Sequence, residues 1–142
     1  MTQEDKELLL KDLCVRFPYG VKIEYAETKK QYRLHELSED GNYFSLLHET
    51  EPTGLCSELG IEYEGKQTIK PYLRQMSSMT DEERDEFRSL GGVMSYSPEH
   101  DHWAISAFSP EAYDYLNSHY FDYRGLIEKG LALEAPKGMY GS

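Results

Sequence analysis

Two histidines in the stretch Glu99-His100-Asp101-His102 are the best candidate metal ligands in this chain. In an extended segment, residues two apart project to the same side, and imidazole suits zinc or copper. A structural zinc site needs four ligands and a catalytic one usually three, but no second cluster has suitable spacing. We therefore favour a polar hairpin tip, and keep a metal-assisted hydrolase using His100 and His102 as an alternative.

Two cysteines could supply a nucleophilic thiol. Cys14 lies among the apolar positions of a predicted helix, which predicts a reduced, buried and inert thiol. Cys56, in TGLCSELG, is expected to be more exposed, but no catalytic signature surrounds it. The chain also has no G-x-S-x-G, Walker-type or G-x-G-x-x-G pattern. The sequence thus favours a non-enzymatic protein, and we expect no cofactor.

A possible ligand site lies in Lys70-Pro71-Tyr72-Leu73-Arg74. Tyr72 could stack on a nucleotide-like ligand and Arg74 could neutralise it, with Tyr123 and Arg124 nearby. The apolar residues at 69, 71 and 73 alternate with polar ones, however, which is typical of a half-exposed strand. We favour the strand and keep a small-ligand binding or sequestering protein as an alternative.

The most distinctive stretch is SPEAYDYLNSHYFDYRGLIEKG, from Ser109 to Gly130. Five aromatic rings fall within eleven positions: Tyr113, Tyr115, Tyr120, Phe121 and Tyr123. Some must belong to the core, but one short helix cannot bury them all. Tyrosine beside arginine is typical of protein interfaces. We therefore predict that Tyr115, Tyr123 and Arg124 contact a partner.

Composition limits the class of protein and of partner. With 142 residues, 39% of them hydrophobic and 13% aromatic, the chain suits one domain over 1–142, with 140–142 as a flexible tail. Its net charge of −11 disfavours nucleic acids and anionic membranes, and suits a protein partner with a basic surface. No stretch approaches the ~20 apolar residues that span a bilayer, and the charged N-terminus does not resemble a signal peptide. We expect a cytoplasmic protein.

The order of predicted elements indicates an α+β fold. An antiparallel sheet of about five to seven short strands, in hairpins and a meander, would pack with three helices. The expected helices begin at Thr2, Thr80 and Ser109 and end near Phe17, Leu90 and Asn117–His119; the expected strands are Val21–Ala26, Gln31–Leu37, Tyr43–His48, Ile61–Glu64, Gln67–Leu73, Val93–Ser97 and Trp103–Phe108. Glu49–Gly60 reads as a loop, and Pro71 indicates an edge or a strand end. An Sm-like small barrel in the first half is the alternative.

Three segments resemble a family of small proteins from phage- and prophage-like regions of gut anaerobic bacteria. They are KELLLKDLCVRFPYGV (Lys6–Val21), IKPYLRQMSSMTDEE (Ile69–Glu83) and YLNSHYFDYRGLIEKGLALEAP (Tyr115–Pro136). The resemblance brings no activity and no catalytic residues; it implies an intracellular accessory protein of a mobile element. Together with the acidic charge, it predicts a non-enzymatic protein that binds a host or phage protein through an acidic, tyrosine-bearing surface.

Overall fold

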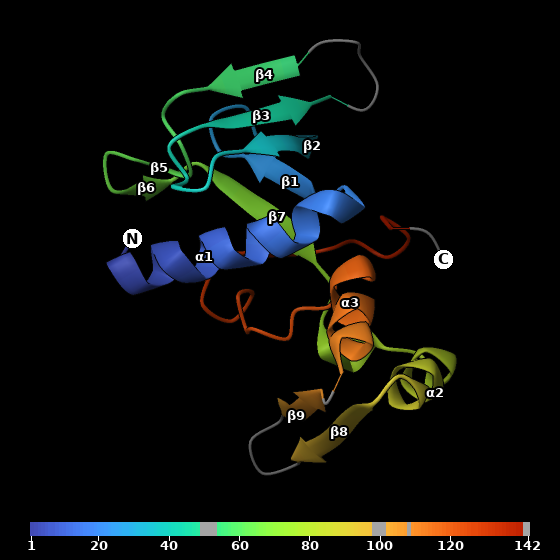
Figure 1. The fold of residues 1–142 in the computed structure, drawn as a ribbon. Coiled ribbons are helices and arrows are strands. Elements are labelled where there is room, and N and C mark those ends of the chain that lie inside the picture. The colour runs from blue at the N-terminus through green and yellow to red at the C-terminus, as the bar shows by residue number, and fades with distance from the viewer. Residues whose placement is uncertain (49–53, 98–101, 108, 141–142) are drawn as a thin grey trace.

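The computed structural model, which describes residues 1–48, 54–97, 102–107 and 109–140, is built on an open six-stranded sheet (Figure 1). The strand order is β10-β7-β1-β2-β3-β4, and all neighbours are antiparallel except β10 and β7. The sheet strands are β1 (Lys22–Tyr25), β2 (Lys30–Leu37), β3 (Phe44–Leu47), β4 (Gly54–Ser57), β7 (Ile69–Leu73) and β10 (Leu133–Glu134). The α+β class is confirmed, and the barrel alternative is wrong because the sheet does not close.

The predicted meander of β1, β2 and β3 is confirmed, but the predicted loop over Glu49–Gly60 is wrong at its second half. Residues Gly54–Ser57 form β4, which pairs with β3 with Cys56 opposite Ser45. A segment this short, with glycine at its first position, has little strand preference of its own. It becomes a strand because β3 offers a row of backbone partners, and local sequence does not report that pairing.

The predicted hairpin around Gly65 is shorter than expected. It consists of β5 (Glu62–Tyr63) and β6 (Lys66–Gln67), with Glu64 and Gly65 at φ values of 51° and 77° in the turn. Two left-handed residues are what a tight two-residue hairpin requires. The following strand, β7, leaves the hairpin and pairs with β1, where Pro71 lies opposite Ile23.

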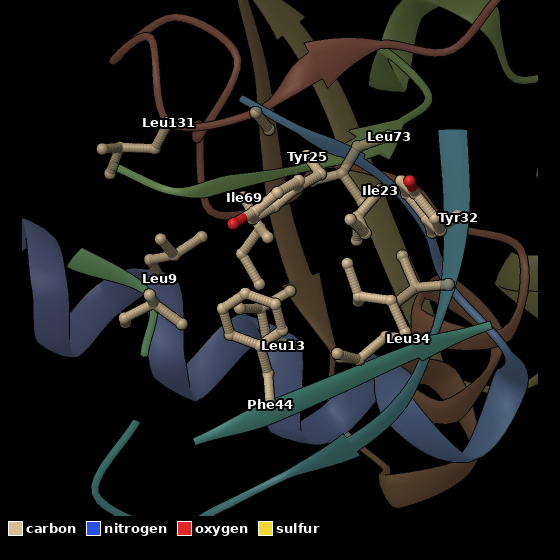
Figure 2. Close-up of a cluster of buried hydrophobic side chains, with 14 of the residues drawn as sticks. Leu9, Leu13, Ile23, Tyr25, Tyr32, Leu34, Phe44, Ile69, Leu73 and Leu131 are labelled. Carbon is tan, nitrogen blue, oxygen red and sulfur yellow. The ribbon is translucent and has the colours of Figure 1, made fainter. Parts of the chain in front are cut away.

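Helix α1 (Gln3–Arg16) lies across the sheet and covers its apolar face (Figures 1 and 2). Leu9 and Leu13 are fully buried against side chains of the sheet, including Ile23 and Phe44. The buried face consists of Leu9, Asp12, Leu13 and Arg16, and is rotated away from Cys14. The prediction of a buried Cys14 is therefore wrong, because this rotation places Cys14 on the exposed side of the helix.

A second group of elements, which we call the helical lobe (residues 75–123), lies beyond one end of the sheet (Figure 1). It contains α2 (Asp81–Ser89), β8 (Gly92–Ser97), β9 (His102–Ala107) and α3 (Pro110–Ser118). Helix α2 begins at the predicted residue, Thr80, with a capping box: the amide of Glu83 donates to the Thr80 hydroxyl, and the Glu83 carboxylate accepts from the amide of Thr80. Ser109 caps α3 with its hydroxyl alone, which accepts from the amide of Ala112.

The helical lobe has its own small core. Met76, Met79, Phe87, Ala112, Tyr115, Leu116 and Phe121 form a second cluster of buried side chains. Phe87 packs so closely under the start of β8 that a Cβ on Gly92 would lie 2.3 Å from its ring. A main-chain bridge between Arg74 and Phe121 ties the lobe to the end of β7.

None of the helices in the described part of the chain is long and apolar enough to cross a membrane.

Candidate functional site

The predicted metal pair cannot be built from the described residues. His100 lies outside them, and of His102 the backbone alone is described, as the first residue of β9. Within residues 1–48, 54–97, 102–107 and 109–140, no three His, Cys, Asp or Glu side chains gather in a way that could hold a metal ion. The hydrolase alternative gains no support from the geometry.

The predicted ligand-binding pair, Tyr72 and Arg74, lies at the end of β7, but each side chain has a partner within the chain. The guanidinium of Arg74 donates two hydrogen bonds to the carboxylate of Glu83, both of 2.8 Å, and lies 4.2 Å from the ring centroid of Phe121. This pairing, above all the hydrogen bond from Arg74, lowers the pKa of Glu83 to about 2. The cation of Arg74 thus joins β7 to α2 rather than facing a ligand.

Tyr72 is half-buried, and its hydroxyl donates to Glu24 at 3.5 Å. Burial, followed by the negative charge of Glu24, raises the pKa of Tyr72. Tyr72 and Arg74 therefore serve different parts of the molecule, since one contacts the sheet and the other the helical lobe.

Of the predicted partner-binding residues, Tyr115 is the most enclosed. It is 5% exposed, stacks on His119 with 4.0 Å between ring centroids, and packs beside Phe87. Burial, assisted by the charge of Glu86, raises its pKa to about 12. Tyr115 supplies core to the lobe, and the exposed ring of α3 is instead Tyr113, at 45%.

Tyr123 and Arg124, which are predicted to contact a partner, face the junction between the lobe and α1. The Tyr123 hydroxyl donates to the side chain of Asn117 at 2.9 Å, and the Arg124 guanidinium lies 4.5 Å from the Tyr123 ring. Arg124 also donates to Asp12 at 2.9 Å. Their pairing is a structural contact between segments far apart in the sequence.

Asp12 and Arg16 form the buried ion pair at this junction, and the sequence reading missed it. Both are fully buried, and Arg16 donates to Asp12 at 2.9 Å and to the backbone oxygen of Phe121 at 2.5 Å. The signal was an acid and a base four apart, continuing the face of Leu9 and Leu13. A helix with Cys14 on its buried face would not bury both Asp12 and Arg16, so the prediction for Cys14 left no place for this pair.

Asp122 is a second buried carboxylate that the sequence reading missed. Its two oxygens accept from the amides of Leu126 and Ile127, each at 2.9 Å, so it caps the turn that follows. Burial raises its pKa, and the two amides oppose that shift. With Asp12 and Arg124, it fixes the path of the chain from α3 back to the sheet.

The remaining candidate is the outer surface of the helical lobe. Between residues 75 and 123 the sequence has ten acidic and two basic residues, a net charge of −8 out of −11 for the chain. Six carboxylates are exposed on the two helices: Asp81, Glu82, Asp85 and Glu86 on α2, and Glu111 and Asp114 on α3. Val93 of β8, at 49%, and Tyr113 add exposed apolar area. We call these six carboxylates, together with Val93 and Tyr113, the acidic face.

Comparisons with protein-family models, with curated proteins and with solved structures find no match to this chain.

Proposed function

We propose that this chain is a non-enzymatic accessory protein that binds a host or phage protein through its acidic face. The observation that carries the proposal is the separation of charge along the chain, because most of the net charge belongs to one lobe that also exposes a tyrosine. A field concentrated in this way attracts a basic surface and steers its approach.

The two helices of the lobe carry seven carboxylates and two cations, Arg84 and Arg88. On α2, Arg84 pairs with Asp81 at 2.9 Å, while Glu83 is paired with Arg74. Helix α3 has no basic residue, so Glu111 and Asp114 have no cation on their own helix. Exposed carboxylates in such numbers are suited to pairing with lysine and arginine of a partner, with Tyr113 as an aromatic anchor.

The lobe is also well organised for binding. The capping box fixes the start of α2, the Arg74–Glu83 pair fixes α2 against β7, and the Ser109 hydroxyl donates to the backbone oxygen of Leu90 as well as capping α3. A surface held in place before binding loses less conformational entropy on association.

The resemblance to proteins of phage- and prophage-like regions supports an intracellular setting, so the proposed partner is a host or phage protein in the cytoplasm. The two other functions have less support. A nucleotide-like ligand would need free cations, but Arg74 and Arg124 are both in ion pairs. A metal-assisted reaction would need a ligand cluster, and the described residues offer none.

The proposal is tested by capture from host lysate with charge-reversed variants. Asp85→Lys with Asp114→Lys changes two exposed mid-helix positions of the lobe and leaves both helix caps intact. The matched control, Glu7→Lys with Glu58→Lys, makes the same charge change at exposed positions outside the lobe. We expect the lobe variant to lose the captured protein and the control to retain it.

Salt provides the second arm of this experiment. Raising ionic strength from 0.1 M to 1 M shortens the screening length from ~10 Å to ~3 Å, and should release the captured protein. Binding through the acidic face would be contradicted if the captured protein stayed bound at 1 M salt and both variants lost it equally.

A further inference from the structure

The side chain of Tyr140 occupies a well-defined aromatic slot at the end of β1 and β7. Its ring stacks on Tyr120 with 3.6 Å between centroids and 15° between planes. The ammonium of Lys22 lies 5.7 Å from the Tyr140 ring centroid and donates to the backbone oxygen of Met139 at 2.9 Å. Tyr140, the first residue of the tail predicted to be flexible, is thus held by a ring and a cation, and the same cation donates to its neighbour Met139.

The hydroxyl of Tyr140 is recognised as both an acceptor and a donor. It accepts from the amide of Lys22 at 2.9 Å and donates to the backbone oxygen of Tyr72 at 2.7 Å. The β1–β7 register ends at Ile23 and Pro71, so this hydroxyl joins the next pair along the two strands. A phenol satisfies both backbone groups, whereas a phenyl ring would leave both unpaired.

The slot is held by the fold and not by the tail. Tyr120 has a left-handed backbone, with φ at 62°, and its own hydroxyl donates to the backbone oxygen of Tyr19. Its backbone oxygen accepts from the amide of Arg74 at 2.7 Å. These contacts hold the Tyr120 ring in place. Since none of them involves the C-terminal segment, the stacking surface does not depend on that segment.

The segment from Ala135 to Tyr140, which we call the strap, is attached to the sheet at both of its ends. The amide of Ala135 donates to the backbone oxygen of Leu73 at 2.7 Å, and Tyr140 fills the slot. Between these anchors Pro136, Lys137 and Gly138 are exposed. Release of Tyr140 therefore needs no change in the sheet or in α1.

We propose that Lys22, Tyr72 and Tyr120 form a binding site for a tyrosyl ring, occupied here by Tyr140 and open to a tyrosine-bearing segment of another protein when the strap detaches. The chemistry is that of a planar ring with one hydroxyl: the ring stacks on Tyr120 beside the Lys22 ammonium, and the hydroxyl bridges an amide and a carbonyl. The site shares no residue with the acidic face, so the two proposals can be tested separately.

Tyr140 acts in this proposal as an intramolecular competitor. A tethered group reaches effective concentrations on the order of millimolar, so a weak external ligand does not displace it from the intact chain. Removing the Tyr140 ring should therefore expose the site.

The test uses the variant Tyr140→Ala and the probe N-acetyl-tyrosinamide, followed by NMR at the backbone amides of Lys22 and Leu73. We expect saturable shifts in the variant and an apparent affinity at least about tenfold weaker in the unmodified chain, where the tail competes. N-acetyl-phenylalaninamide should bind Tyr140→Ala at least about tenfold more weakly than the tyrosine probe, because both backbone groups stay unpaired. The control variant Tyr113→Ala, which removes an exposed tyrosine elsewhere, should leave the Lys22 amide unchanged.

Two results would overturn the proposal. One is a folded Tyr140→Ala protein with no shift of the Lys22 amide signal at millimolar probe; the other is equal affinity for the two probes.

Hydrogen exchange of the unmodified chain tests the proposal even if the variant fails to fold. The Lys22 amide should exchange at least about tenfold faster than the Leu34 amide, which donates to Val21 within the sheet, because the strap opens locally. Equal rates for the two amides would show that the strap does not open.

Discussion

The sheet with α1 and the helical lobe bury apolar surface in different ways. Among the described residues, fifteen buried side chains form the core between the sheet and α1, and seven form the core of the lobe. The larger core is mainly aliphatic, whereas the smaller one consists of two methionines, three aromatic rings, an alanine and a leucine. The lobe compensates with polar contacts, notably the capping box and the Arg74–Glu83 pair.

This difference predicts that the sheet with α1 is the more stable region, whereas the proposed binding surface lies on the helical lobe. A small core with few buried contacts unfolds locally at lower free energy than a large one. The acidic face belongs to the helical lobe, the region with the smaller core, and its like charges repel one another. The sheet and α1 provide the rigid base, and the buried pair of Asp12 and Arg16 joins the two regions.

The largest effect should come from breaking that junction. Asp12→Ala leaves the fully buried guanidinium of Arg16 without its carboxylate, which should lower the free energy of unfolding by about 3–5 kcal/mol. Urea unfolding followed by far-UV circular dichroism measures the loss. Replacing both residues, as Asp12→Leu with Arg16→Met, should recover part of it, because only the partly exposed Arg124 then lacks its carboxylate. A double variant no better than Asp12→Ala would contradict this explanation.

Phe87→Ala should separate the two regions. Removing this fully buried ring takes about 3–5 kcal/mol from the lobe. Hydrogen exchange should then quicken at the amide of His119, at the end of α3, while the Leu34 amide of the sheet stays protected. The matched variant Leu13→Ala, in the larger core, should quicken both amides together. Uniform loss of protection in Phe87→Ala would show that the two regions unfold as one.

Acid should weaken the lobe through Glu83. The pKa of Glu83 falls from 4.5 to about 2 in the folded protein, so its contribution is fully present above pH 4.5 and is lost as the pH falls toward 2. Glu83→Gln should therefore flatten the pH dependence of unfolding across that window. The control Glu82→Gln, at an exposed neighbour on α2, should leave the slope unchanged.

The smallest effect should come from the helix cap. Thr80→Ala removes the acceptor for the Glu83 amide and should cost about 1 kcal/mol. Thermal unfolding measures it, and Thr80→Ser, which keeps the hydroxyl, should restore the midpoint. An equal loss in Thr80→Ser would show that the hydroxyl is not what matters.

Features set by neighbouring residues could be predicted from the sequence, and features set by distant contacts could not. The capping box at Thr80 needs residues three apart, and the alternation in β1 needs residues two apart. Strand β4 depends on pairing with β3, so its residues looked like a loop.

The candidate site shows the same limit. The sequence predicted an aromatic and acidic surface, but it could not decide which ring of α3 faces outward, because Tyr113 and Tyr115 have similar neighbours. Their environments differ through Phe87, which packs beside Tyr115 from another helix. The identity of the buried face of α1 likewise depended on the partners of Arg16, one of which is the backbone of Phe121, distant in the sequence.

Carboxylate footprinting of the captured complex tests the central claim most directly. Mass spectrometry would compare carbodiimide labelling of exposed acids in the free and the bound chain. Binding through the acidic face predicts strong protection of Asp85, Glu111 and Asp114, with Glu7 and Glu58 labelled as before. Protection of Glu7 and Glu58 with unchanged labelling on α2 and α3 would contradict it.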